Sequence, residues 1–233
     1  MLINKIRLLV QAFSFLILTY GGRIGINLGY ALPCFACPYV AGCGGYCFLM
    51  FLQRVGIFGI AAYDRIFTYI GLQNLLWFLI FAVSAIILSK FWCGWICPFG
   101  SLLDALSGLR KKMGIREIEF SWTVRTMIKP IKYIFLAVIL VVPLLIAFLG
   151  LSSDFYILFC KICPARPIMP IFAGDIRRFG LEYSNWSTLI ISIVSVSFAA
   201  ITIVGSFFKD RFFCMVCPML PLIHLFNKLS PVR

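Results

Sequence analysis

Long apolar runs separated by short basic connections dominate the pattern of the chain. Three runs, at 70–91, 131–151 and 188–208, carry charge only near their ends. A fourth begins after Lys5 and Arg7 and extends from residue 8 into the thirties. Since about 20 apolar residues cross a bilayer as a helix, the pattern predicts an all-α integral membrane protein with about four transmembrane helices.

The segment 48–67 is apolar but does not match the other runs. It contains Arg54, Asp64 and Arg65, together with two glycines. Charges at such depth are costly in a bilayer, so we expect an interfacial or re-entrant helix here instead of a complete crossing.

The composition limits the classes of protein. Hydrophobic residues make up 62% of the chain and charged residues 12%, against about 25% charged in soluble domains. The formal net charge is +13, but the basic residues lie in the connections, where they set topology and meet anionic lipid headgroups. We therefore expect membrane lipid as a partner and no nucleic acid.

Close cysteine pairs followed by proline are the most informative motif. One lies in the stretch FWCGWICPFG, and the four pairs together use eight of the ten cysteines. The pairs are Cys34 and Cys37, Cys93 and Cys97, Cys160 and Cys163, and Cys214 and Cys217. Such spacing is typical of metal or redox sites.

The pairs recur with an almost constant offset. Cys163 follows Cys37 by 126 positions, and Cys217 follows Cys97 by 120. We therefore expect two parallel repeats, at 1–120 and 121–233, each with two spans and two cysteine pairs.

The alternating direction of four spans predicts which cysteines meet. The pairs after spans one and three share one face, and those after spans two and four share the other. The face with both termini and the connection 90–132 carries 14 Lys and Arg, and the opposite face carries 7. By the positive-inside tendency, both termini and the second group are cytoplasmic in an integral cytoplasmic membrane protein.

Each group of four thiolates suits one [4Fe–4S] cluster. The outer cluster would use Cys34, Cys37, Cys160 and Cys163, and the inner one Cys93, Cys97, Cys214 and Cys217. Structural zinc and thiol–disulfide exchange are the alternatives. Two clusters at the surfaces of a slab roughly 30 Å thick would need a carrier between them, unless both are recessed.

Cys43 and Cys47 remain after this assignment. They are candidates for alternative ligands of the outer cluster, for a disulfide, or for a third centre. Haem is not expected as an intrinsic cofactor, because His224 is the only histidine.

The stretch from Trp92 to Gly100 closely resembles the membrane iron–sulfur proteins of the NapH and NosR type, whose spans end in Cys-x-x-x-Cys-Pro. The pair at Cys214 and Cys217 resembles the second such step, with two intervening residues instead of three. The resemblance implies electron transfer between the quinone pool or a cytoplasmic donor and a redox enzyme on the outer face.

The further group of six cysteines is an addition to that pattern. It favours a conduit between a cytoplasmic ferredoxin-like or iron–sulfur subunit and a redox enzyme or carrier on the outer face. Such a chain would be an electron-transfer subunit of a larger oxidoreductase complex. A quinone-reactive subunit and a membrane thiol–disulfide or metal-handling protein are the alternatives.

Overall fold

The structure is a computed structural model that describes residues 2–30, 32–37, 39–58, 69–88, 91–119, 121–149, 157–174 and 185–228. Within these ranges the fold is all-α, and the only strand-like feature is an isolated bridge between Leu32 and Cys47. The longer helices are α1 (Leu2–Tyr20), α3 (Tyr69–Leu88), α4 (Pro98–Lys112), α6 (Ile131–Leu149) and α9 (Trp186–Phe208). The shorter ones are η1 (Gly21–Ile24), α2 (Phe48–Phe58), η3 (Trp92–Ile96), α5 (Trp122–Ile128), α7 (Leu158–Ile162), α8 (Ala165–Phe172), α10 (Phe212–Val216) and α11 (Met219–Lys228).

Among the residues that the structure describes, three helical segments are long and apolar enough to cross a membrane. They are Gly71–Leu88, Thr126–Ile146 and Trp186–Phe208. Large apolar side chains on these segments face outward: Leu72 is 65% exposed and Val204 is 57% exposed. Contiguous apolar surface of this kind suits lipid and not water, in agreement with a membrane protein.

The first apolar run differs from its prediction. Its helix, α1, ends at Tyr20, and the chain then turns through η1 and Gly25, whose φ is +84°. Glycine adopts this conformation without steric cost. The loop that follows folds back onto α1, where the backbone N–H of Gly44 donates to the Leu18 carbonyl at 3.0 Å.

The segment after Cys47 forms a short buried helix. Its 11 described residues in α2 span roughly 17 Å at 1.5 Å per residue. Phe48 and Leu49 are fully buried, and α2 packs on α6. The interfacial or re-entrant helix predicted over 48–67 is described only as far as residue 58, because residues 59–68 lie outside the described part of the chain.

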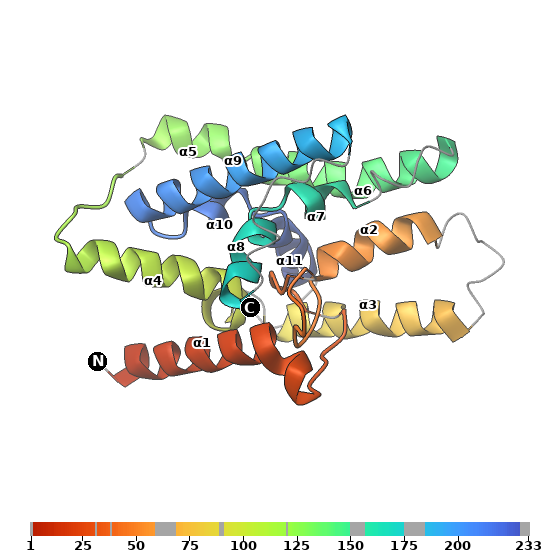
Figure 1. Cartoon of the computed structure of the whole chain (residues 1–233), viewed down its shortest axis with the longest axis horizontal. Helices are drawn as coiled ribbons and strands as arrows, with labels where there is room; N and C mark the ends of the chain where they lie inside the picture. The colour runs from red at the N-terminus through yellow and green to blue at the C-terminus, as the bar shows by residue number, and fades with distance from the viewer. Residues whose placement is uncertain are drawn as a thin grey trace.

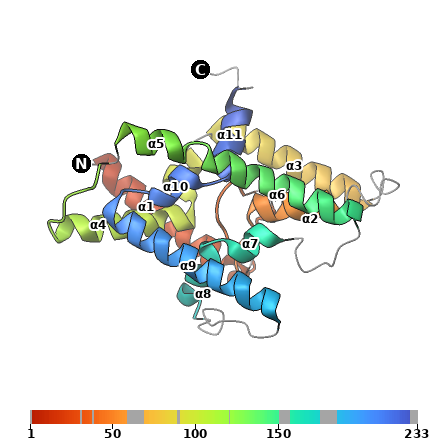
Figure 2. The same cartoon turned by 90° about the horizontal axis from the view of Figure 1, so that it is seen from above.

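The helices α1, α3, α6 and α9 alternate in direction. Figure 1 shows α1 and α6 running one way along the molecule and α3 and α9 running the other way. Helix α4 packs on α1 and α9 toward one end, and α2 packs on α6 toward the other. The short helices α7, α8, α10 and α11 lie between the two ends, as both views show (Figures 1 and 2).

A buried arginine fastens α9 to α4. Arg110 is 1% exposed and donates to the Phe208 carbonyl at 2.7 Å and to Asp210 Oδ1 at 2.6 Å. Because the last carbonyls of a helix lack intrahelical donors, Arg110 satisfies the C-terminus of α9. The chain that leaves α9 is therefore held close to α4.

Candidate functional site

Three of the cysteine–proline steps form the same local structure. In each, a five-residue helix ends at the second cysteine, and a new helix starts at or just after the proline. The cysteine before the proline is extended, with ψ values of 115° at Cys97, 132° at Cys163 and 121° at Cys217. Proline disfavours the helical region for the residue before it, so the dipeptide itself breaks the helix there.

This break makes both cysteines of a step line one cavity. The first cysteine lies in the short helix (η3, α7 or α10) and the second at the break. Cys93 and Cys97 line the first cavity, as do Cys214 and Cys217, whereas Cys160 and Cys163 line the second cavity.

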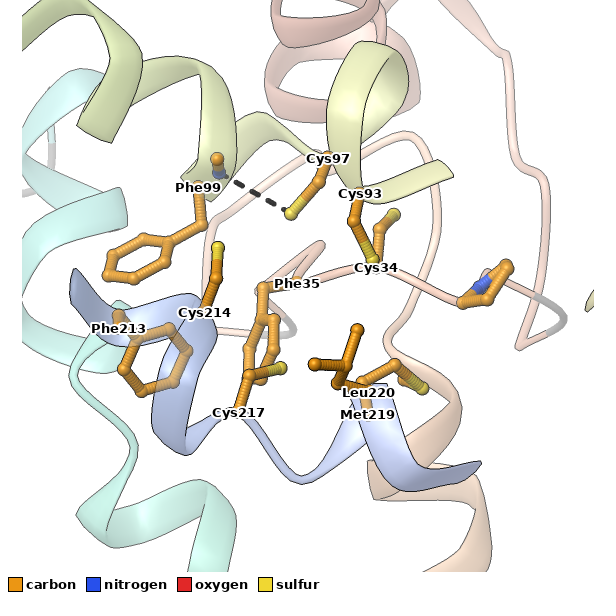
Figure 3. Close-up of a pocket in the computed structure, with 12 residues that line it drawn as sticks. Cys34, Phe35, Cys93, Cys97, Phe99, Phe213, Cys214, Cys217, Met219 and Leu220 are labelled. Carbon is orange, nitrogen blue, oxygen red and sulfur yellow. Dashed lines mark hydrogen bonds between the residues drawn. The ribbon is translucent and has the colours of Figure 1, made fainter. Parts of the chain in front are cut away.

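The first cavity has a volume of about 30 Å³. Figure 3 shows Cys93 and Cys97 across it from Cys217, with Cys214 beside Phe213 and with Cys34 and Phe35 entering from the cysteine-rich loop. Among the described residues that line it, no side chain carries oxygen or nitrogen. A buried water needs two to four polar partners, so this lining suits a thiolate-bound group and not water.

The second cavity has a volume of about 20 Å³. Its four thiols are Cys37, Cys47, Cys160 and Cys163, and each is 5–8% exposed. The other lining residues are Phe35, Ala36, Tyr39, Leu49, Phe159 and Ala165.

The structure groups the predicted residues differently in one respect. Cys93, Cys97, Cys214 and Cys217 lie together as predicted, but Cys34 lies with them and not with Cys37. Cys47, which the sequence analysis names only as a candidate alternative ligand, takes its place in the second cavity. The cause is the loop: Cys34 and Cys37 are separated by two residues, and their segment passes between the cavities.

The two cavities also lie side by side. Phe35 lines both, and three Cα–Cα steps of about 3.8 Å place Cys34 and Cys37 within about 11 Å of each other. The expectation of two groups on opposite faces of the membrane is therefore corrected. It assumed that each step ends a complete crossing, whereas the first step lies in a loop that folds back into the protein.

Cys43 lines neither cavity. It is 7% exposed and lies in the loop beside Gly22. All ten cysteines are free thiols, so the predicted Cys43–Cys47 disulfide alternative is not formed.

The thiols are protonated when nothing binds them. Burial raises the pKa of Cys93 and of Cys214 to about 12, with a further contribution from Cys97. Burial likewise raises the pKa of Cys160 to about 12. Metal binding would release these protons, because thiolate is the ligand form.

A charged network holds the elements around the first cavity. Asp104 of α4 accepts from Arg211 Nε at 2.7 Å and Nη2 at 2.6 Å, from Arg7 at 2.5 Å and from Gln11 at 2.7 Å. Gln11 and Arg211 also donate to the carbonyl of Gly94, within the Cys93–Cys97 step. Burial is the largest single effect on Asp104 and opposes its ionisation, but the hydrogen bonds from Arg211 and Gln11 and the charges of Arg211 and Arg7 together outweigh it and lower the pKa of the carboxyl.

Aromatic rings close off the first cavity. Phe35, Phe99 and Phe213 are 1–5% exposed, and the Phe213 ring contacts the other two edge-on at 5.3 and 5.2 Å. Phe91 and Trp95 instead stack on each other at 4.9 Å, and Phe91 is 40% exposed. Of the flanking aromatics, the first set excludes water and the second fits an interfacial belt.

A single metal ion and a cluster place different demands on the four thiols. Within the described ranges, no three His, Cys, Asp or Glu side chains converge closely enough to hold one metal ion. Zinc requires four sulfurs at about 2.3 Å from one point. The four ligands of a cubane bind four different irons, so their sulfurs surround a cavity instead.

Comparison with known proteins supports this chemistry. The family described as 4Fe-4S binding domain matches residues 70–116 and 191–233. These segments contain Cys93, Cys97, Cys214 and Cys217, which are the four paired thiols of the first cavity. No curated protein and no solved structure matches the chain significantly. The match supports an iron–sulfur protein.

Sequence reasoning named Cys47 as a candidate alternative ligand of the outer cluster, and in the structure a helix begins directly after it. It missed Asp104, which accepts from Arg211, and Gln53, which donates to Cys160 Sγ. The sequence carries no signal for these two residues, because their partners lie about 100 residues away along the chain.

Proposed function

We propose that the chain is a membrane electron-transfer subunit with a [4Fe–4S] cluster in the first cavity. The observation that carries the proposal is the convergence of four family-matched thiols on one apolar cavity. Two clusters per chain, as predicted from the eight thiols, belong to the same proposal. When bound, such clusters supply one-electron redox chemistry.

The protein's own residues bind, orient and shield the cluster. The break at each proline directs the thiols of Cys97 and Cys217 into the cavity, and the backbone N–H of Gly100 donates to Cys97 Sγ at 3.4 Å. Hydrogen bonds to sulfur and low water access both tune cluster potentials. Arg211 adds a positive charge beside Cys214 and Cys97, which offsets the negative thiolate ligands.

The exposed basic residues at the α4 end support a choice of cytoplasmic partner. We propose that the α4 end faces the cytoplasm and receives a ferredoxin-like or iron–sulfur subunit with an acidic surface. Lys111, Lys112 and Arg116 are exposed there, and complementary charge steers such encounters. A redox enzyme or carrier at the outer face would complete the route, within a larger oxidoreductase complex.

The test is iron and acid-labile sulfide analysis of anaerobically purified protein, with an electron paramagnetic resonance (EPR) spectrum after reduction. We expect about eight irons per chain for two cubanes. The double substitution Cys93→Ser and Cys97→Ser should remove about half of the iron and one EPR signal. Protein without iron or sulfide would overturn the proposal and favour a thiol–disulfide relay.

A quinone-reactive subunit is the second candidate, and one cavity favours it. A space of about 710 Å³ lies between α1 and α4, with Leu8, Ala12 and Leu16 among its apolar residues and Gln11 and Asp104 among its polar ones. Ligand sites commonly combine this size with an apolar lining and few polar groups.

Gly108 provides a test of this candidate. It lines the cavity in α4, and a Cβ there would meet no atom within 4 Å. Gly108→Phe should fill the space and abolish reoxidation of the reduced protein by a soluble quinone, whereas Gly108→Ala should leave it unchanged. Equal rates in both variants would exclude quinone from this cavity.

A further inference from the structure

We infer that Cys37, Cys47, Cys160 and Cys163 form a second [4Fe–4S] site, with Cys47 and not Cys34 as its fourth ligand. The inference rests on the proposed iron–sulfur function but not on the family match, which ends at residue 116 and resumes at 191. None of the four cysteines lies in the matched segments.

The donor set and its surroundings fit such a cluster. Four thiols from three segments, the loop, the start of α2 and the α7–α8 break, line one cavity. Each thiol is at most 8% exposed. Of the described residues that line the cavity, Tyr39 alone has an oxygen or nitrogen in its side chain, so this lining offers sulfur ligands in a nearly water-free environment.

Cys47 has the same structural position as two of the proposed ligands of the first cavity. It directly precedes α2, as Cys97 precedes α4 and as Cys217 and its proline precede α11. A helix N-terminus presents unpaired N–H groups that stabilise negative charge. Cys34 is not followed directly by a helix, and it lines the first cavity instead.

Gln53 donates a hydrogen bond to one of the four thiols of this site. Its side chain is 1% exposed, and its Nε2 donates to Cys160 Sγ at 3.2 Å and to the Leu49 carbonyl at 3.1 Å. Its Oε1 accepts from the backbone N–H of Phe159 at 3.2 Å. The amide is therefore fixed with a donor toward sulfur, an arrangement that orients a ligand and raises a cluster potential.

Three single serine variants, at Cys34, Cys43 and Cys47 of the cysteine-rich loop, test the assignment. All three thiols are buried, so a difference between the variants does not come from a difference in exposure. Each is purified anaerobically and analysed for iron, sulfide and zinc, and by EPR after reduction. We expect Cys47→Ser to lose about four of about eight irons while keeping the signal that Cys93→Ser removes. Cys34→Ser and Cys43→Ser should keep about eight.

The retained signal of the first centre shows that the Cys47→Ser variant is folded. Loss of half of the iron in Cys34→Ser but not in Cys47→Ser would overturn the assignment in favour of the predicted set. One zinc per chain without a second portion of sulfide would overturn the cluster. If no variant or parent protein contains iron, the proposed function itself fails, which is a different result.

The shared Phe35 gives a second readout. Because it lines both cavities, two paramagnetic centres would lie close enough for their spins to interact. We expect a broadened EPR spectrum in the fully reduced parent protein and a sharp single signal in Cys47→Ser. Simple addition of two independent signals would contradict the side-by-side placement.

Discussion

At the scale of single residues, Asp104 joins four segments around the first cavity. Its carboxylate binds Arg7 of α1 and Arg211, which precedes α10, and both Arg211 and Gln11 reach the Gly94 carbonyl in η3. Arg211 has a φ of 53°, a left-handed conformation that costs a non-glycine residue roughly 1 kcal/mol or more. The bidentate pair with Asp104 holds Arg211 in this conformation.

We expect Asp104→Asn to loosen the first centre selectively. The amide cannot accept both bonds from Arg211, and loss of a charge-assisted bond costs on the order of 2 kcal/mol. Thermal unfolding in detergent should shift downward, and the EPR signal of the first centre should decrease more than that of the second. Glu119→Gln, an exposed carboxylate in the connection after α4, is the matched control.

An Asp104→Asn protein with the unfolding temperature and iron content of the control would show that the network does not position the site. Equal loss of both signals would indicate general unfolding instead of a local role.

At the scale of elements, the turn from α9 into α10 places Cys214. Gly205 faces the ring of Phe212, and a Cβ on Gly205 would come within 2.4 Å of a ring carbon. Such contact is far below van der Waals distance, so the ring or α10 would have to move. The close approach depends on the missing side chain of glycine.

Gly205→Ala should therefore destabilise the protein by about 1–3 kcal/mol and reduce the iron content of the first centre. Gly108→Ala is the matched control, because that helical glycine faces open space. Alanine there should stabilise α4 by about 0.5–1 kcal/mol. Thermal unfolding of the two variants in the same detergent compares them, and equal shifts would contradict the packing argument.

The elements show what the sequence could predict. The helical breaks at Cys97 and Cys217 follow from the proline directly after each cysteine. It was therefore predictable that the two cysteines of one step lie together. The apolar runs of α3 and α9 were predictable for the same local reason. The membership of Cys34 and Cys47 was not, because it depends on how a glycine-containing loop folds back onto α1.

At the scale of the whole molecule, the number of crossings is decided by α1. Its 19 residues span roughly 28 Å, close to the thickness of the apolar slab. Leu9 and Phe13 are 66–68% exposed on the side of α1 that faces away from the rest of the protein, while Gln11 faces α4. This surface suits lipid, so we propose that α1 crosses in addition to the three apolar segments.

The number of membrane crossings, four with α1 or three without it, decides where the two termini lie. Four crossings put both termini on one face, whereas three put them on opposite faces. The 14 Lys and Arg predicted on the terminal face, against 7 on the other, favour both termini in the cytoplasm.

We expect reporter fusions at the N-terminus, at the C-terminus and after Gly114 all to report the cytoplasm. Gly114 lies just after α4 with a φ of +73°, and a Cβ there would meet no atom within 4 Å, so an insertion there should be tolerated. An outer N-terminus with a cytoplasmic C-terminus would show that α1 lies in the interface. The α4 end, with its exposed Lys112 and Arg116, would still face the cytoplasmic donor, because the fusion after Gly114 reports its side independently of α1.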